Sequence, residues 1–377
     1  MKLIIKLLVL CVLLPLHGCS QVPEQAPLVV APPSQAALED VVAPEEEEQE
    51  EEEDIVELLL AQMTLRQKIG QLFITTVPED LSFISNYGIG GVILFSGDIQ
   101  SEEQVKKLIA DMQKEADIPL FVAIDEEGGR VRRTAALDVP HVPPAWEIGQ
   151  QGNGHLAYYY AKSIANYLAP LGFNLNFAPV ADLHSNPANT VIGDRAFHSD
   201  PTKSTTMVEF FVKGLEEGGI LSTLKHFPGH GDTIEDSHFG SATVYFDINR
   251  LREVEFKPFL AGIEAGASMV MVGHILTPSV TDDGLPATFS RYLLEDILRD
   301  ELGFEGVIVT DALNMGAITH YFGSGQTAVK AIEAGVDLLL MPQCFDEAFY
   351  TLLEYVEAGR ISEERITESV RRVLKLK

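Results

Sequence analysis

Short apolar segments alternate along the chain with longer segments whose apolar residues recur at helical spacing. The apolar segments have the length of buried strands, and SEEQVKKLIADMQKEA at 101–116 is typical of the helical pattern between them. Buried strands that alternate with helices form parallel sheets, and eight such units close a barrel. We therefore predict an α/β fold, a (β/α)8 TIM barrel, in one domain over residues 55–377. The eight predicted strands cover residues 70–77, 90–95, 119–125, 174–182, 220–228, 267–275, 306–313 and 336–342.

The first residues depart from this pattern. Two lysines precede an apolar run at 7–16, which is shorter than the roughly 20 residues that span a bilayer. The run ends in Leu-His-Gly-Cys, which resembles a bacterial lipobox, so we expect 1–19 to be a lipoprotein signal peptide with lipidation at Cys19. The protein would then be exported and lipid-anchored to a bacterial membrane, on the periplasmic or surface side of the cell envelope. An uncleaved anchor and plain secretion are the alternatives.

Residues 20–54 are rich in Pro, Ala, Gln and Glu and end in EEEEQEEEED. A run of like charges repels itself and buries nothing, which predicts a disordered acidic linker. Fully extended, such a linker reaches on the order of 100 Å, enough to hold a domain away from a membrane.

Charge and cysteine content narrow the classes of function. The formal net charge is −29, with 12 of the 56 acidic residues in 1–54, and this argues against nucleic acid as a partner. If Cys11 is removed with the signal and Cys19 is lipidated, only Cys344 remains, so no disulfide within the chain is expected. Cys344 itself is predicted to be a small buried apolar side chain.

Ionisable residues follow the ends of several predicted strands. The carboxyl ends of the strands form the active-site face of this type of barrel, so these residues are expected to converge there. A single Asp after a strand can simply be the N-cap of the next helix. Ionisable residues at the ends of five different strands are not explained in this way. The residues are Asp125, Asp182, Lys225 with His226, His274 and Asp311.

Four segments carry most of these residues, and one of them, KHFPGHGDTIEDSH at 225–238, holds three histidines. The others are AIDEEGGRVRR at 123–133, PVADLHSNPANTVIGDRAF at 179–197 and GFEGVIVTDALNMGAI at 303–318. Together and in this order, the four segments resemble glycoside hydrolase family 3, in particular its single-domain β-N-acetylhexosaminidases of the NagZ type. The resemblance extends from about residue 60 to the C-terminus.

Sugar removal needs a group that stabilises the developing oxocarbenium ion and a donor that protonates the leaving oxygen. Asp311 is the candidate nucleophile of a retaining mechanism, because it follows the apolar strand GVIVT, and Ala312 and Gly316 leave room for a ring. The resemblance implies that His238 is the acid and base and that it is paired with Asp236. A carboxylate two residues away in an extended loop can hold one imidazole nitrogen while the other faces the substrate.

The remaining site residues are expected to bind or support the sugar. By geometry and by the resemblance, the substrate-binding residues are Asp125, Arg133, Arg195, Lys225 and His226. Asp182, His230 and His274 are expected behind them. His230, between glycines in the PGHG turn, is expected to brace its loop by hydrogen bonds, and the role of His274 is undecided.

The resemblance implies an exo-acting β-N-acetylhexosaminidase that releases terminal β-linked GlcNAc from peptidoglycan fragments (muropeptides) or chitooligosaccharides. An exported chain of this kind would act in peptidoglycan turnover or carbohydrate metabolism at the envelope. We expect no metal and no organic cofactor, and the outward helix faces single out no oligomer interface.

Several alternatives stay open. Among enzymes they are a β-glucosidase or broad exo-β-glycosidase and a GlcNAc phosphorylase. A non-catalytic glycan-binding lipoprotein and a metal-dependent hydrolase that uses His226, His230 and His238 as ligands are more distant. The absence of an HxH or HExxH motif and the cationic neighbour Lys225 disfavour the metal site.

Overall fold

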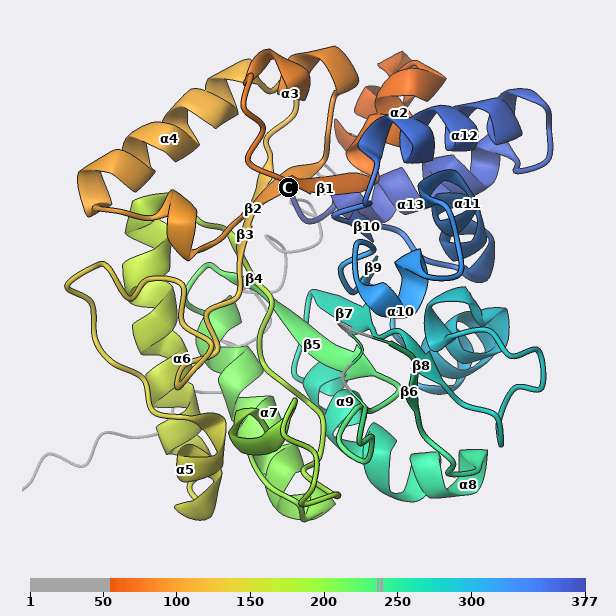
Figure 1. The fold of residues 1–377 in the computed structure, drawn as a ribbon. Helices are drawn as coiled ribbons and strands as arrows, with labels where there is room; N and C mark the ends of the chain where they lie inside the picture. The colour runs from red at the N-terminus through yellow and green to blue at the C-terminus, as the bar shows by residue number, and fades with distance from the viewer. Residues whose placement is uncertain (1–54, 236, 238–239) are drawn as a thin grey trace, which may run out of the picture. The chain divides into compact units, whose positions relative to one another are not determined.

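The computed structural model describes residues 55–235, 237 and 240–377 (Figure 1). The predicted signal peptide at 1–19, with Cys19, and the predicted linker at 20–54 lie outside the described residues, as do Asp236 and His238. Within the described ranges, none of the helices combines the length and the apolar character needed to cross a bilayer.

Eight parallel strands form the predicted barrel. They are hydrogen-bonded in the order β10-β1-β2-β3-β4-β5-β7-β9, and a parallel bridge between Val309 and Leu338 brings the two edge strands together. Each strand falls within one of the eight segments predicted from sequence, and the TIM-barrel prediction is confirmed. The strands are β1 (Phe73–Thr76), β2 (Gly91–Leu94), β3 (Phe121–Ile124), β4 (Leu175–Asn176), β5 (Leu221–Phe227), β7 (Met269–Val272), β9 (Val307–Thr310) and β10 (Leu339–Leu340).

The strands are shorter than the apolar segments that predicted them. The segment 174–182 contributes only Leu175–Asn176 to β4, although Val180 later forms an isolated bridge with Lys225. Pro179 lies between the two pairings, and proline has no backbone N–H to donate to a ladder. The apolar run therefore continues into the loop that leaves the barrel.

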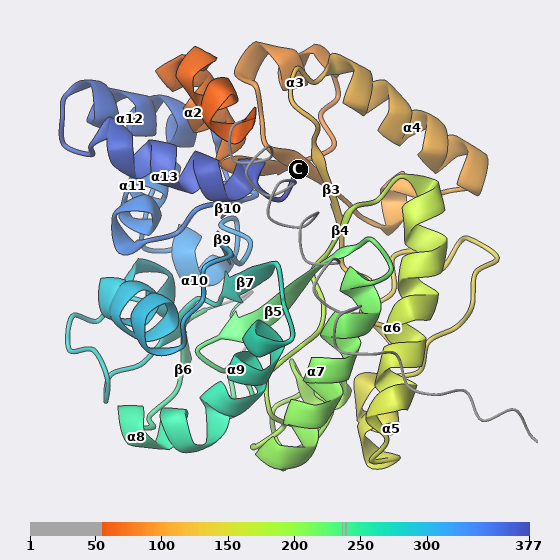
Figure 2. The same cartoon turned by 180° about the vertical axis from the view of Figure 1, so that it is seen from behind.

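Helices surround the strands in both views of the ribbon (Figures 1 and 2). A helix at 55–62 precedes α2 (Leu65–Gln71), α3 (Ser82–Tyr87), α4 (Glu102–Glu115), α5 (Ala145–Gln150), α6 (Gly154–Leu168) and α7 (Pro201–Glu216). They are followed by α8 (Ile248–Arg250), α9 (Phe256–Glu264), α10 (Gly316–Thr319), α11 (Ser324–Ala334), α12 (Phe345–Glu357) and α13 (Glu363–Leu374). Leu251–Glu255 and Tyr292–Glu301 are π-helical, and 3₁₀ turns cover Ser96–Asp98, Ala169–Leu171, Gly193–Arg195 and Ala287–Phe289.

Alternation along the strands divides the core in two. In β1, Phe73 packs in the cluster shared with the helices, whereas Ile74 belongs to a separate cluster made mostly of strand residues. That second cluster, which includes Phe121, Met269 and Val307, is fully buried and fills the barrel. A filled barrel is not a pore, so a ligand site has to lie at an end of the strands.

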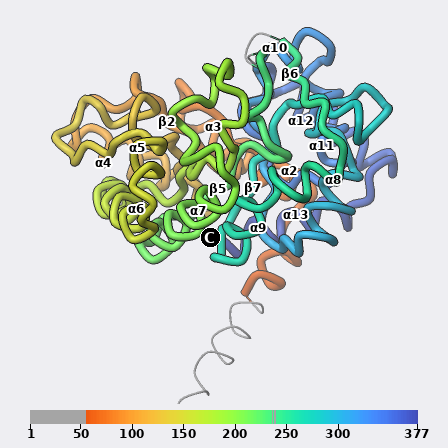
Figure 3. The backbone as a smooth tube through the Cα atoms, turned by 90° about the horizontal axis from the view of Figure 1, so that it is seen from below, coloured from red at the N-terminus to blue at the C-terminus, as the bar shows by residue number. Residues whose placement is uncertain are grey.

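The segments that follow β5 and β9 lie at the same end of the barrel. The short strand β6 (Ala242–Thr243) follows β5 and pairs in parallel with β8 (Ile275–Leu276), which follows β7. In the view turned by 90° in Figure 3, β6 and α10 lie near each other at one edge. This is the edge formed by the carboxyl ends of the strands.

The cysteine prediction is wrong. Cys344 is exposed, because it lies just before α12 as its N-cap residue instead of within the core. Its backbone N–H donates to Ser324 Oγ at 2.9 Å.

Candidate active site

A cavity of about 320 Å³ opens at the carboxyl ends of the strands. This size lies at the lower end of the range of about 300–1,000 Å³ that is typical of small-molecule sites. Its walls combine apolar residues from inside the barrel with charged residues from the strand ends. They are Ile93, Phe95, Asp125, Glu127, Val131, Arg133, Phe177, Val191, Arg195, Lys225, His226, His230, Ser237, Met271, Asp311, Ala312, Asn314, Met315, Leu340 and Met341.

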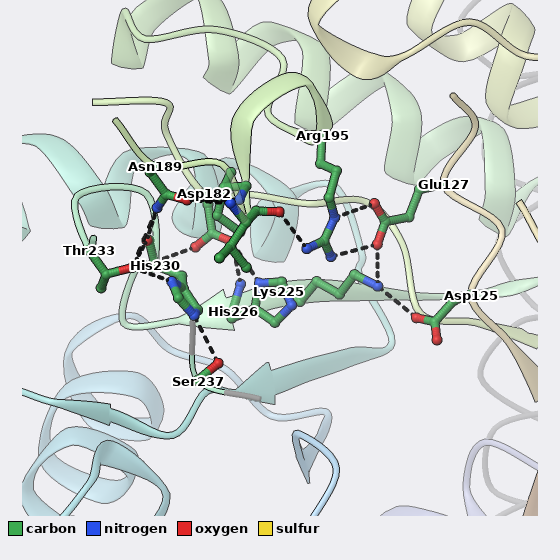
Figure 4. Close-up of polar contacts among 12 residues, drawn as sticks. Asp125, Glu127, Asp182, Asn189, Arg195, Lys225, His226, His230, Thr233 and Ser237 are labelled. Carbon is green, nitrogen blue, oxygen red and sulfur yellow. Dashed lines mark hydrogen bonds and ion pairs between the residues drawn. The ribbon is translucent and has the colours of Figure 1, made fainter. Parts of the chain in front are cut away.

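A chain of ion pairs runs along one wall (Figure 4). Lys225 Nζ lies 2.8 Å from Asp125 Oδ1 and 2.7 Å from Glu127 Oε1. Glu127 also accepts two hydrogen bonds from Arg195, at 2.9 Å from Nε and 2.8 Å from Nη2. Glu127 thus holds two cationic side chains that come from the segments after β4 and in β5.

Burial makes these interactions strong. Burial alone would raise the pKa of Glu127, but the adjacent Arg195 and Lys225 outweigh it and hold this pKa well below the usual carboxyl range. For Arg195 the burial effect, which lowers the pKa, is likewise outweighed by Glu127, and its pKa lies above the ordinary value. Both side chains are therefore charged at neutral pH.

Asp125 occupies the open end of this chain of ion pairs. Its side chain is 19% exposed, whereas the side chain of Lys225 is 2% exposed. Arg133 Nη2 lies 3.5 Å from Asp125 Oδ2, so the carboxylate is flanked by two cations. A carboxylate held in place at a cavity wall can accept hydrogen bonds from ligand hydroxyls.

Asp182 lies behind the cavity and fixes the neighbouring histidine. It is 1% exposed and accepts from the backbone N–H groups of His226 at 3.1 Å and His230 at 2.7 Å. Its Oδ2 also lies 2.7 Å from His226 Nδ1, which leaves Nε2 as the ring nitrogen that Asp182 does not engage. Burial opposes ionisation of Asp182, but His226 and the other donors lower its pKa.

His230 makes hydrogen bonds within its own loop and to its neighbours. Its Nδ1 lies 2.7 Å from Thr233 Oγ1, its Nε2 lies 3.0 Å from Ser237 Oγ, and its carbonyl accepts from Asn189 Nδ2 at 2.8 Å. Burial, reinforced by the nearby His226, lowers the pKa of His230, which favours the neutral ring.

Asp311 directly follows β9 and lines the same cavity as these residues. Its backbone N–H donates to Val272 O at 2.9 Å, and its Oδ1 accepts from the Ala312 N–H at 2.8 Å. His274 does not line the cavity; its Nε2 lies 3.0 Å from Ala312 O and its Nδ1 lies 2.7 Å from Thr288 Oγ1. His274 therefore supports the backbone that follows Asp311.

The structure thus brings seven of the predicted residues into one cavity: Asp125, Arg133, Arg195, Lys225, His226, His230 and Asp311. Asp182 and His274 lie behind it. The predicted pair Asp236 and His238 lies outside the described residues, whereas Ser237 between them lines the cavity and its carbonyl accepts from the Ala317 N–H at 3.2 Å.

Sequence reasoning missed Glu127. The motif IDEEGG offers two glutamates, and only their alternation separates them: Glu127 is two positions after Asp125 and lies on the same side, as in an extended segment. Glu126 points away and accepts from the Arg133 N–H at 2.7 Å, from Thr134 Oγ1 at 2.6 Å and from Tyr167 Oη at 2.9 Å. The supporting roles of Asn189 and Thr288 had no sequence signal.

Among the described residues, no group of three or more His, Cys, Asp or Glu side chains is arranged to hold a metal ion. The rings of His226 and His230 lie with centroids 5.8 Å apart, and both ring nitrogens of His230 and the Nδ1 of His226 make the hydrogen bonds given above.

Replacing Glu127 by Gln should leave Arg195 and Lys225 buried without their shared anion. Truncating one partner of a buried charge pair costs about 2–5 kcal/mol, so kcat/KM should fall by about thirtyfold or more. Steady-state kinetics of Glu127→Gln beside Glu147→Gln, an exposed control, test this. Equal activity of the two variants, with circular dichroism showing both folded, would contradict the role of Glu127.

Several known proteins are similar to this chain in sequence. The sequence model described as "Glycosyl hydrolase family 3 N terminal domain" matches residues 64–376. Beta-hexosaminidase A of Pseudoalteromonas piscicida is 37% identical over 333 residues, which cover 80% of this chain and 56% of the relative. The beta-hexosaminidase of Stenotrophomonas maltophilia (strain R551-3) is 36% identical over 284 residues, covering 73% of this chain and 83% of the relative.

Solved structures show the same likeness. A glycoside hydrolase family 3 beta-N-acetylglucosaminidase from Paenibacillus sp. str. FPU-7 superposes with a TM-score of 0.81 and is 42% identical, over 84% of this chain and 62% of that chain. The beta-glucoside phosphorylase BglX superposes with a TM-score of 0.80 at 26% identity, over 87% and 60%. The chain thus spans less than two thirds of the length of several relatives, but the family model covers most of it, and the chain belongs to glycosyl hydrolase family 3.

Proposed function

We propose that this protein is an exo-acting β-N-acetylhexosaminidase that releases terminal β-linked GlcNAc with retention of configuration. The observation that carries the proposal is that one cavity is lined both by Asp311 and by the ion-paired Asp125 and Lys225. The names of the relatives, beta-hexosaminidase and beta-N-acetylglucosaminidase, support the choice of sugar.

The closed barrel favours action at a chain end. Phe177 and Met271 line the cavity and also belong to the apolar cluster that fills the barrel, so the cavity has a floor. A terminal sugar can rest on this floor while the rest of the glycan leaves through the mouth. Asp125 would accept from its hydroxyls, and Lys225, Arg133 and the Nε2 of His226 would donate to them.

In the proposed reaction, the Asp311 carboxylate attacks the anomeric carbon while the bond to the leaving oxygen breaks. That oxygen takes a proton from His238, and the sugar remains as an ester on Asp311. A water molecule then attacks the anomeric carbon, His238 takes its proton, and the bond from that carbon to the Asp311 oxygen breaks, which releases Asp311 as a carboxylate. The ion-paired cations stabilise the bound sugar but exchange no proton in either step.

His238 with Asp236 is the proposed acid and base. A neutral imidazole in the second step places no additional anion beside Asp311, and the Asp236 carboxylate would keep the imidazolium available for the first step. The buried neighbour Ser237 lines the cavity, which supports a role for this segment at the site.

Phosphorolysis is the second candidate. Similarity to the structure of the beta-glucoside phosphorylase BglX favours it, and an acid and base without negative charge would tolerate phosphate as the acceptor. Reaction with and without phosphate distinguishes the two, because phosphorolysis yields the sugar 1-phosphate and hydrolysis yields the free sugar.

We also propose that the protein is exported and anchored through Cys19, with the acidic segment 20–54 as a tether. The motif at 16–19 and the charge run at 45–54 support this. The glycan substrates would then be peptidoglycan fragments or chitooligosaccharides at the cell envelope.

Asp311→Asn should lower the hydrolysis of 4-nitrophenyl β-GlcNAc by about a thousandfold or more, because the amide cannot serve as the nucleophile. Asp138→Asn makes the same chemical change at an exposed position, so this control variant should retain activity. Release of nitrophenol is the measurement. Unchanged hydrolysis by Asp311→Asn would refute the assignment of the nucleophile.

His238→Ala should separate good leaving groups from poor ones. Nitrophenolate needs little protonation, whereas a sugar alkoxide needs a proton, so the loss should be at least about tenfold greater on chitobiose than on the aryl glycoside. The exposed His320→Ala serves as the control. A loss of the same size on both substrates would argue against His238 as the acid.

A further inference from the structure

A second cavity of about 590 Å³ adjoins the first, and we call it the side cavity. Asn314 and Met341 line both. The side cavity lies where the chain leaves β1 toward α3 and leaves β10 toward α12 (Figure 1). We propose that it binds the sugar on the leaving-group side of the scissile bond and that it selects an uncharged sugar. This inference rests on the proposed function.

The apolar wall of the side cavity is a fixed pair of rings. Phe83 and Phe345 meet edge to face, with centroids 4.7 Å apart and an interplanar angle of 65°. Phe345 is held from behind by Phe73 at 5.0 Å and Phe349 at 5.7 Å. Both Phe83 and Phe345 remain half-buried, so part of each ring faces the cavity. Rigid aromatic surfaces suit the C–H faces of a pyranose ring.

Neutral polar groups surround this wall. Thr76, Asn314 and Gln343 line the side cavity and are exposed. One hydroxyl and two amides supply donors and acceptors together, which match sugar hydroxyls and an acetamido group. The combination of apolar faces and neutral polar edges is the composition expected for a carbohydrate subsite.

The absence of charge distinguishes the side cavity from the first. Among the described residues that line the side cavity, none is Asp, Glu, Lys, Arg or His. The first cavity, in contrast, is lined by five charged residues in addition to Asp311 and the histidines. A carboxylate on the leaving sugar would therefore find no cation there, and the net charge of −29 would repel it at longer range. A neutral N-acetylglucosamine unit, as in chitooligosaccharides, fits better than a lactyl-bearing muramic unit.

Met341 lines both cavities and therefore lies where they adjoin. Its φ of 50° is in the left-handed region, which few residues other than glycine adopt. Its backbone N–H donates to Ile74 O at 2.8 Å, which ties this conformation to the end of the barrel. Strained residues of this kind occur often at ligand sites, and here the strain falls at the junction that a scissile bond would cross.

The test compares two disaccharides that differ in the leaving sugar: chitobiose, which is uncharged, and GlcNAc-β-1,4-MurNAc, which carries a carboxylate. The full chain should show a kcat/KM at least about tenfold higher on chitobiose. Gln343→Arg places a cation in the side cavity and should shift this ratio toward the anionic disaccharide by about threefold to tenfold, less at high salt. Thr190→Arg, the same added charge at an exposed position outside the side cavity, should leave the ratio within about twofold.

The possible results distinguish a failure of the side-cavity proposal from a failure of the proposed function. Equal kcat/KM on the two disaccharides, or equal shifts in Gln343→Arg and Thr190→Arg, would overturn the side cavity as a leaving-group site. The proposed function would survive that result if 4-nitrophenyl β-GlcNAc is still hydrolysed. No release of GlcNAc from the aryl glycoside or from either disaccharide would overturn the proposed function and this inference with it.

Discussion

The site depends on the buried carboxylate of Glu127, which binds Lys225 and Arg195 at once. Arg195 comes from the segment after β4, and Lys225 comes from β5. Two cations so deeply buried would repel each other without a shared anion. The pairing also directs Lys225 toward Asp125. One acidic side chain thereby sets the positions of three others around the space for a ligand.

The barrel separates apolar residues, which fill its interior, from the charged residues of the cavity. Apolar side chains fill the interior up to Phe177 and Met271, and the charged residues begin where the strands end. Residues behind the cavity act on those in front of it: Asp182 orients His226, and His274 supports the backbone next to Asp311. The groups that face a ligand are therefore held by hydrogen bonds that do not involve the ligand, which is the preorganisation that binding and catalysis require.

The sequence predicted those features that show both in the type of residue and in the spacing of apolar positions. Buried parallel strands are continuous apolar runs, so all eight could be predicted, and the ionisable residues at their ends, such as Asp125 and Asp311, followed directly. Glu127 could not be separated from Glu126 by residue type, because only the direction of each side chain differs. Cys344 was misjudged because its type favours burial while its place before a helix decides exposure. Asp236 and His238 remain predictions.

In the proposed reaction Asp311 forms a covalent bond to the sugar, and trapping this intermediate is the sharpest experiment on the mechanism. A slow fluorinated GlcNAc donor would be incubated with the full chain, followed by intact-protein mass spectrometry and peptide mapping. We expect an added mass of one sugar residue on the peptide that contains Asp311, and retained configuration of the product by NMR. Absence of an adduct together with an inverted product, or an adduct on another residue, would contradict it.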